Sequence, residues 1–316
     1  MLNKLNKNLI ITIAAATVIL FLFGVLSDFT SIINSFAKFN WLLLPVLLLL
    51  SLGNYVVRFF KWDYYLKLLK IKVTTSQSVK VFFSGLSMSA SPGKMGEVLK
   101  SILLKEMINE PISKTAPIIF AERVTDFLSL IFVTILVGFF YDYSGFIVYV
   151  VLIFYIVLIL IVSNRPLAEN LILLISRIHF IEPHVEKIKT IYESSYILLK
   201  PKPLFKMFVI SIFSWFFECF GFYLILINFD LHVSVFFPTF VFALSIVLGA
   251  ASMLPGGLGV TEGSLSLLLI NSGVANDTAV ASTIILRVVT LWFAVLLGFV
   301  VLTFLRREIR QSSLGK

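Results

Sequence analysis

Two similar stretches interrupt this apolar sequence: PGKMGE at Pro92–Glu97 and PGGLGVTE at Pro255–Glu262, 163 residues further along. Each combines a proline, glycine and a glutamate, and each lies inside a hydrophobic segment. Proline removes a backbone donor, and glycine costs about 1 kcal/mol in the interior of a helix. We therefore predict that Ser78–Leu104 and Ser234–Ile270 each form two half-helices joined by unwound backbone, with neither half long enough to cross a membrane alone.

The composition excludes an ordinary soluble domain. Of the 316 residues, 59% are hydrophobic and 14% are charged, and 32 are phenylalanine. A bilayer core of about 30 Å is crossed by roughly 20 helical residues. The sequence therefore predicts an all-α integral membrane protein with six full spans in addition to the two broken segments. The predicted spans are Leu9–Leu26, Trp41–Phe60, Thr115–Phe140, Ser144–Val162, Lys206–Phe229 and Ala279–Leu305.

The order of segments recurs along the chain. An arginine follows Pro92 after 31 residues, at Arg123, and another follows Pro255 after 32 residues, at Arg287. One ordinary span precedes each broken segment. The spacing predicts two repeats, residues 41–140 and 206–305, each made of a span, a broken hairpin and a span that carries a buried arginine.

The distribution of positive charge predicts the topology. If both broken segments are re-entrant hairpins and Ser144–Val162 adds a span between the repeats, the second repeat is inverted relative to the first. Among the 26 lysines and arginines, Arg123 and Arg287 then lie within spans, and only Lys38 falls on the second face. Lysines and arginines concentrate on the cytoplasmic side of membrane proteins. We therefore expect both termini in the cytoplasm, because single crossings of the broken segments would scatter these charges.

Residues 164–203 form the predicted linker between the repeats. Its sequence IEPHVEKIKTIYESSYILLK places Val185, Ile188, Tyr192 and Leu199 along one helical stripe. An amphipathic helix of this kind is typical of the membrane interface. We expect it to lie on the cytoplasmic surface, and the alternative is a regulatory docking helix.

Charged residues at membrane depth point to a binding site, because burying them is costly. Arg123 lies about 12 Å from the start of its predicted helix, and Arg287 approaches the midplane from the opposite side. Half-helices that restart after Gly96 and Gly259 point free N–H groups at the centre, where arginine adds forked donors for phosphate. The predicted substrate-binding residues are Arg123, Arg287, Lys94, Glu97, Glu262, Gly93, Gly96, Gly256, Gly257 and Gly259.

The acidic residues leave alternatives open. Glu97 and Glu262 fit the first turns of the restarting half-helices, where a carboxylate either caps the helix or takes part in substrate binding or coupling. Glu218, in SWFFECFG, stands alone in its span and can pair with any of the buried cations.

The motif ERVTD places two carboxylates, Glu122 and Asp126, four residues apart on one helix face. Both stay ionised in a low dielectric only with a cation nearby, so we expect pairing with Arg123, Arg287 or Lys94, or protonation of one carboxylate. The two interpretations are a structural ion-pair network and a proton carrier that couples transport.

Arg58 and Lys61 lie in VVRFFKWDYYL, beside aromatic residues at the predicted cytoplasmic end of a span. An interfacial anchor is the favoured interpretation and a phosphate contact the alternative. Together with Lys100, these residues form a predicted cytoplasmic entrance.

Other chemistries have no support in the sequence. The three histidines lack metal-ligand spacing, no P-loop occurs, and we expect no metal and no cofactor. The net charge of +9 is assigned to cytoplasmic loops beside anionic lipid, and no nucleic-acid partner is expected.

Four motifs, RFFKWDYYL, GLSMSASPGKMGEVLKSILL, AERVTDFLSL and MLPGGLGVTEGSLSLLL, resemble the lysylphosphatidylglycerol synthase transmembrane-region family. This is the flippase-like domain also found in the multiple peptide resistance factor, and the resemblance extends from about Leu9 to Leu305. It implies a membrane domain that moves an aminoacylated or other anionic lipid, or a polyprenyl-phosphate-linked sugar, between leaflets, and it suggests a part in antimicrobial peptide resistance. The matching positions are Arg58, Lys61, Pro92, Gly93, Gly96, Glu97, Lys100, Glu122, Arg123, Asp126, Pro255, Gly256, Gly257, Gly259, Glu262 and Arg287.

The two-domain members of that family also carry a cytosolic aminoacyltransferase domain, whereas this chain stops shortly after Leu305. We therefore expect a lipid flippase in a prokaryotic plasma membrane and not an enzyme. The alternatives are an enzyme of the phosphatidylglycerol lysyltransferase type and a non-transporting membrane partner of an envelope synthase. The expected partners are the lipid itself and a lipid synthase or glycosyltransferase.

Overall fold

A computed structural model of the chain describes residues 29–91, 95–139 and 185–314, with scattered helical positions between 149 and 170. Helices connected by short turns make up these ranges, and no strand occurs in them. The predicted all-α class is therefore confirmed for the described part of the chain. The predicted span Leu9–Leu26 and most of Ser144–Val162 lie outside the described residues.

Within the described ranges, three helices are long and apolar enough to cross a membrane. The first is Trp41–Leu68, in which the short turn η1 (Trp41–Leu43) continues directly into α3 (Leu44–Leu68). Asn40 begins it, because its side-chain oxygen accepts the N–H of Leu42 at 3.1 Å. The predicted start of this span is confirmed. The predicted end at Phe60 is wrong, because the helix continues for two further turns.

The other two long helices lie in the second half of the chain. The helix α10 (Pro201–Asn228) begins five residues before the predicted Lys206, with proline in its first turn. The span Asn276–Gln311 comprises α13 (Asn276–Arg287), the π-helical segment η6 (Val288–Trp292) and most of α14 (Phe293–Leu314). It contains the predicted Ala279–Leu305.

The helix α6 (Ile112–Gly138) corresponds to the predicted span Thr115–Phe140. It has 27 residues, with Pro117 in its second turn. Its middle carries the charged motif ERVTD, so it is less apolar than the three spans described above.

A short helix, α2 (Phe29–Lys38), stands at the start of the described residues, before η1 and α3.

Both predicted breaks occur. The first segment contains α4 (Thr75–Gly85), the turns η2 (Leu86–Met88) and η3 (Met95–Val98), and α5 (Leu99–Ile108); the second contains α11 (Phe236–Ala251) and α12 (Val260–Asn271). In each segment the two helices pack against one another. The α12 helix begins directly after Gly259, as predicted. The first restart differs, because Ser91 Oγ accepts the Gly96 N–H at 2.7 Å and a 3₁₀ turn precedes α5, which begins only at Leu99.

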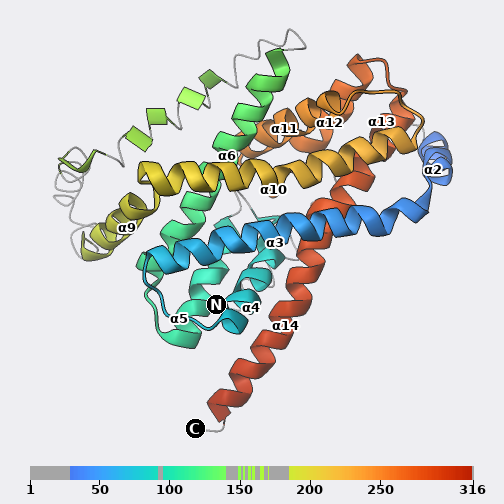
Figure 1. Cartoon of the computed structure of the whole chain (residues 1–316). Helices are drawn as coiled ribbons and strands as arrows, with labels where there is room; N and C mark the ends of the chain where they lie inside the picture. Colours follow the sequence, from blue (N-terminus) through green and yellow to red (C-terminus); the bar gives the residue numbers. More distant parts are fainter. Residues whose placement is uncertain are drawn as a thin grey trace.

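The helices pack in a crossed arrangement. The helix α3 lies along α10, and the hairpins α4/α5 and α11/α12 lie on opposite sides of this pair (Figure 1). The helix α6 packs against α11, and α14 packs against α4 and η2. The two breaks touch, because the Gly256 N–H points to the Ser91 carbonyl at 3.4 Å. The two interrupted segments are therefore in contact at their breaks.

The linker helix α9 (Val185–Leu198) packs against α6. Its buried residues are Ser194, Ser195 and Leu198, whereas Glu186 and Lys189 are exposed. The predicted linker therefore contains a helix, and its position on the cytoplasmic surface stays a prediction. The next helix, α10, begins at Pro201, inside the predicted range 164–203.

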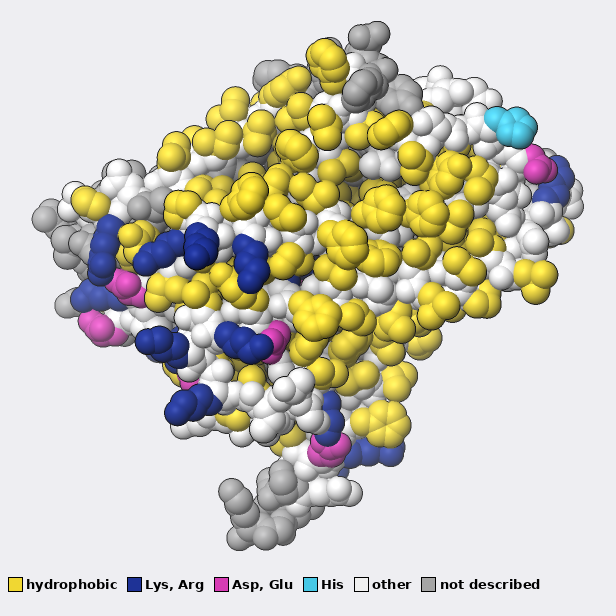
Figure 2. All heavy atoms as spheres, viewed as in Figure 1, with side chains coloured by type: hydrophobic (Ala, Val, Ile, Leu, Met, Phe, Trp, Pro, Cys, Tyr) yellow, Lys and Arg dark blue, Asp and Glu magenta, His cyan; other side chains and the backbone are white. Residues whose placement is uncertain are grey.

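The surface is divided into an apolar and a charged region. Figure 2 shows apolar side chains across the middle of the face formed by α3 and α10, and lysine and arginine side chains toward the end where α9 and α5 lie. Leu49 on α3 and Phe213 on α10 are 66% and 56% exposed. So large an exposed apolar area requires lipid around it.

The contact between α14 and η2 depends on a glycine. A Cβ added at Gly298 lies 2.1 Å from the Ser87 backbone nitrogen, whereas one added at Gly221, in α10, meets nothing closer than 3.8 Å. We predict that Gly298→Ala lowers the free energy of unfolding by about 1–3 kcal/mol, as overpacking does. Gly221→Ala should stabilise the protein by roughly 0.5–1 kcal/mol. Thermal unfolding in detergent checks both, and equal midpoints for the two variants would contradict the packing.

Candidate functional site

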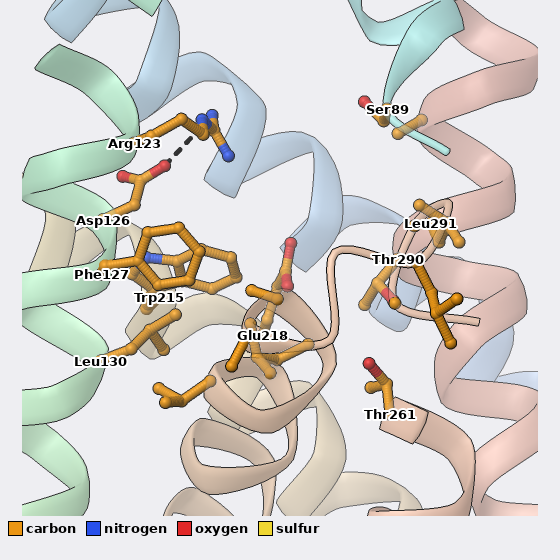
Figure 3. Close-up of a pocket in the computed structure, with 18 of the residues that line it drawn as sticks. Ser89, Arg123, Asp126, Phe127, Leu130, Trp215, Glu218, Thr261, Thr290 and Leu291 are labelled. Carbon is orange, nitrogen blue, oxygen red and sulfur yellow. Dashed lines mark ion pairs between the residues drawn. The ribbon is translucent and has the colours of Figure 1, made fainter. Parts of the chain in front are cut away.

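A cavity of about 630 Å³ lies between α3, α6, α10, α11, the break before α12, and the π-helical segment. Most of its walls are apolar, with Phe120, Phe127 and Trp215 among them. Figure 3 shows Arg123 and Asp126 on one side, Thr261, Thr290 and Leu291 on the other, and Glu218 between them. The charged residues that line it are Arg58, Arg123, Asp126, Glu218 and Arg287.

Two arginines at the cavity wall share the same two carboxylates. Arg123 Nη2 lies 3.2 Å from Asp126 Oδ2 and 3.5 Å from Glu97 Oε2. Arg58 Nη2 lies 3.9 Å from the same Asp126 oxygen and 3.8 Å from Glu97 Oε1. The Arg58 separations exceed hydrogen-bond length. Arg123 Nε has no hydrogen-bond partner among the described residues. Both guanidinium groups therefore keep donors for an anionic ligand.

Arg58 and Lys61 are not interfacial anchors. They are 6% and 1% exposed, and that interpretation is wrong because both side chains are buried and α3 continues for two more turns before it ends. Lys61 Nζ donates to Asp126 Oδ1 at 2.6 Å, to Ser211 Oγ at 2.7 Å and to the Glu122 carbonyl at 3.1 Å. Lys61 thus fixes Asp126 from the side away from the cavity.

Lys100 is also buried and does not line the cavity. Its Nζ lies 2.5 Å from Glu122 Oε2 and 3.4 Å from Glu97 Oε2, and it lies 4.7 Å from the centre of the Trp62 ring. The Lys100 side chain crosses Gly85, where an added Cβ would lie 2.5 Å from Lys100 Cγ. The predicted entrance role of Lys61 and Lys100 has no support in this placement.

These contacts define a buried cluster on the first half of the chain, which we call the ion cluster. Its four cations are Arg58, Lys61, Lys100 and Arg123, and its three carboxylates are Glu97, Glu122 and Asp126. With every group ionised, these seven groups carry one net positive charge, and Glu218 on the cavity wall, which interacts electrostatically with Arg58, offsets it.

The second half of the chain contributes a tighter pair. Arg287 Nε lies 2.6 Å from Glu262 Oε1, and Arg287 Nη2 donates to the Gly256 carbonyl at 2.7 Å. Glu262 Oε2 accepts the Gly259 N–H at 2.6 Å. The capping role predicted for Glu262 is therefore confirmed. Glu97 differs, because it lies in a 3₁₀ turn and faces cations rather than a helix start.

Glycine is required at the second break by backbone conformation. Gly256, Gly257 and Gly259 have φ angles of +60°, +68° and +84°, a backbone conformation that residues with a Cβ atom rarely adopt. Directly after Arg287, the helix widens into the π-helical segment, and Tyr55 donates its hydroxyl to the Thr290 carbonyl at 2.6 Å. Such segments are common at functional sites.

The remaining predicted residues are placed as follows. Glu218 is 8% exposed and lines the cavity, and Gly96 lies in η3 behind Ser91. Gly93 and Lys94 lie outside the described residues. Within the described part, no group of three or more His, Cys, Asp or Glu side chains is placed to hold a metal ion.

The pair of Lys100 and Glu122 gives a test of the ion cluster. We predict that Lys100→Met lowers the free energy of unfolding by about 3–5 kcal/mol, because Glu122 is left as an uncompensated buried charge. Lys100→Met combined with Glu122→Gln should recover most of that loss. Chemical denaturation in detergent measures both, and an additive loss in the double variant would contradict the pairing.

Comparison with known proteins agrees with this architecture. The family described as "Lysylphosphatidylglycerol synthase TM region" matches residues 9–298. A UPF0104 membrane protein of Methanocaldococcus jannaschii is 28% identical over 233 residues, which cover 71% of this chain and 96% of that protein. A UPF0104 membrane protein of Methanothermobacter thermautotrophicus is 32% identical over 92 residues, covering 29% of this chain and 28% of that protein. The chain is therefore a multi-pass membrane protein that belongs to the lysylphosphatidylglycerol synthase transmembrane-region family.

Proposed function

We propose that the protein moves a phosphate-bearing lipid between the two leaflets of a prokaryotic plasma membrane and holds the headgroup in the central cavity. The observation that carries the proposal is the pair Arg58 and Arg123, which line an apolar cavity and share Glu97 and Asp126, with Arg58 beyond hydrogen-bond length of both and Arg123 Nε without a described partner. The substrate class is an anionic or aminoacylated phospholipid or a polyprenyl-phosphate-linked sugar, all of which carry phosphate.

The chemistry of the cavity supports this substrate class. Guanidinium groups bind phosphate oxygens through paired N–H donors, and these contacts are stronger away from bulk water. Phe120, Phe127 and Trp215 offer apolar surface beside the arginines. A lipid has the same division, with a charged headgroup next to hydrocarbon.

The carboxylates give the site a way to release its ligand. Asp126 and Glu97 hold the arginines when no phosphate is bound, and a phosphate competes with them for the same donors. Protonation of one carboxylate would free a guanidinium, and ionisation would recapture it. We propose this exchange as the coupling step, with Lys61 keeping Asp126 in position.

The packing supports a repeat of two similar halves. If α3, α4/α5 and α6 correspond to α10, α11/α12 and α13–α14, the contact of α6 with α11 corresponds to that of α14 with α4. Exchanging the two halves swaps α3 with α10, so the contact between these two helices is left unchanged. We propose that residues 41–140 and 206–305 are the two repeats, that both broken segments are re-entrant, and that both termini lie in the cytoplasm.

Movement of one repeat against the other would open the site to each side in turn. The two breaks are the proposed place of separation. They touch through the Gly256 N–H and the Ser91 carbonyl, and Ala90 and Leu258 belong to one buried apolar cluster at this place.

Reconstitution tests the proposed function. We predict that Arg58→Gln and Arg123→Gln each reduce the rate of fluorescent phosphatidylglycerol movement in proteoliposomes roughly tenfold or more, since one charge-assisted contact contributes about 1.5–3 kcal/mol. The matched control is Arg307→Gln, an exposed arginine on α14. Arg287 is less informative, because its loss also removes contacts with Glu262 and Gly256.

Transport by both variants at the unmodified rate would contradict the proposed headgroup site. If the unmodified protein alone moves no lipid, the alternative of a non-transporting partner of an envelope synthase is favoured instead.

A further inference from the structure

A second hollow lies at the surface and shares no lining residue with the central cavity. It has a volume of about 470 Å³ and is formed where the end of α3, the start of α6 and α9 meet. Its lining residues are Leu68, Leu69, Lys70, Lys114, Lys189, Thr190, Glu193, Ser194 and Ile197. The hollow therefore combines three lysines from three elements with apolar and hydroxyl side chains.

The carboxylates around the hollow already have cationic partners. Glu193, inside it, pairs with Arg165 at 2.8 Å. Glu110 lies 3.2 Å from Lys114, and Glu186 lies 3.1 Å from Lys189. On α3, Asp63 pairs with the exposed Lys67 at 2.6 Å.

Lys70 differs from the other two lysines of the hollow. No ion pair of Lys70 occurs among the described residues, and the residue follows the end of α3 with a φ angle of +54°. The local charge is therefore positive after all of these pairs are formed. An anion that enters the hollow meets ammonium groups, and each of the carboxylates named above has a cation beside it.

The height of the hollow indicates what kind of anion reaches it. The apolar helix Trp41–Leu68 has 28 residues, which corresponds to about 42 Å and exceeds a hydrocarbon core of about 30 Å. Its end at Leu68 then lies at the level of the lipid headgroups. Figure 2 shows lysine and arginine side chains gathered at this end of the molecule.

We propose that this hollow binds the phosphate of an anionic phospholipid from the surrounding leaflet. Lys70, Lys114 and Lys189 donate to the phosphate oxygens, and Leu68 and Ile197 contact the apolar part of the lipid next to the headgroup. Because the lysines come from three elements, a bound lipid links α9 to α3 and α6. The site would thereby fix the linker between the two halves of the chain.

Native mass spectrometry of the purified full chain, titrated with phosphatidylglycerol, tests this site. Lys70→Gln/Lys114→Gln/Lys189→Gln should weaken the binding of one phosphatidylglycerol at least tenfold. The matched control Lys105→Gln/Lys187→Gln/Lys202→Gln removes the same charge from exposed lysines outside the hollow and should change it less than twofold. Replacing the three lysines of the hollow by arginine should preserve binding and thus exclude misfolding as the cause. Phosphatidylcholine should bind equally to all variants.

The titration is run with and without Arg123→Gln, because the effect of the three lysines should be the same in both backgrounds. The proposal would be overturned if both triple glutamine variants weakened phosphatidylglycerol binding equally, or if neither variant weakened it. Displacement of phosphatidylglycerol by an equal concentration of inorganic phosphate would assign the hollow to free phosphate rather than to lipid.

Discussion

The structure is organised around the shared contact of Arg58 and Arg123 with Glu97 and Asp126. Charges within an apolar protein in lipid need partners, and these four come from α3, η3 and α6. Lys61 binds Asp126 and also Ser211 on α10, and Lys100, which belongs to α5, binds Glu122. The ion cluster therefore also contacts α10 and α5. The same contacts that join the helices also leave two guanidinium groups at the cavity wall, so the proposed binding site and the packing of the helices depend on one arrangement.

The two halves of the chain share an order of elements but differ in chemistry. The first half holds the ion cluster, with one cation in excess, whereas the second holds the close pair of Arg287 and Glu262. Glu262 also caps α12, so its pair is part of the helix start. The proposed headgroup contacts therefore come from the first half, and the second half supplies glycine-rich backbone and the π-helical segment.

Local sequence predicted the features that depend on backbone chemistry. Both helix breaks, the start of α12 after Gly259 and the cap by Glu262 follow from proline, glycine and glutamate within a few residues. The role of Lys61 was not predictable in this way, because its partner Asp126 is 65 residues away and an interfacial lysine has the same local pattern. The π-helical segment likewise has no local signal; its freed Thr290 carbonyl is satisfied by Tyr55 from α3.

An experimental structure in nanodiscs containing phosphatidylglycerol tests the central claim most directly. We predict a lipid phosphate in the central cavity, within hydrogen-bond distance of the guanidinium groups of both Arg58 and Arg123, with Asp126 still bound to Lys61. A cavity that holds only acyl chains, with every headgroup at the membrane surface and both arginines still bound to Glu97 and Asp126, would contradict it.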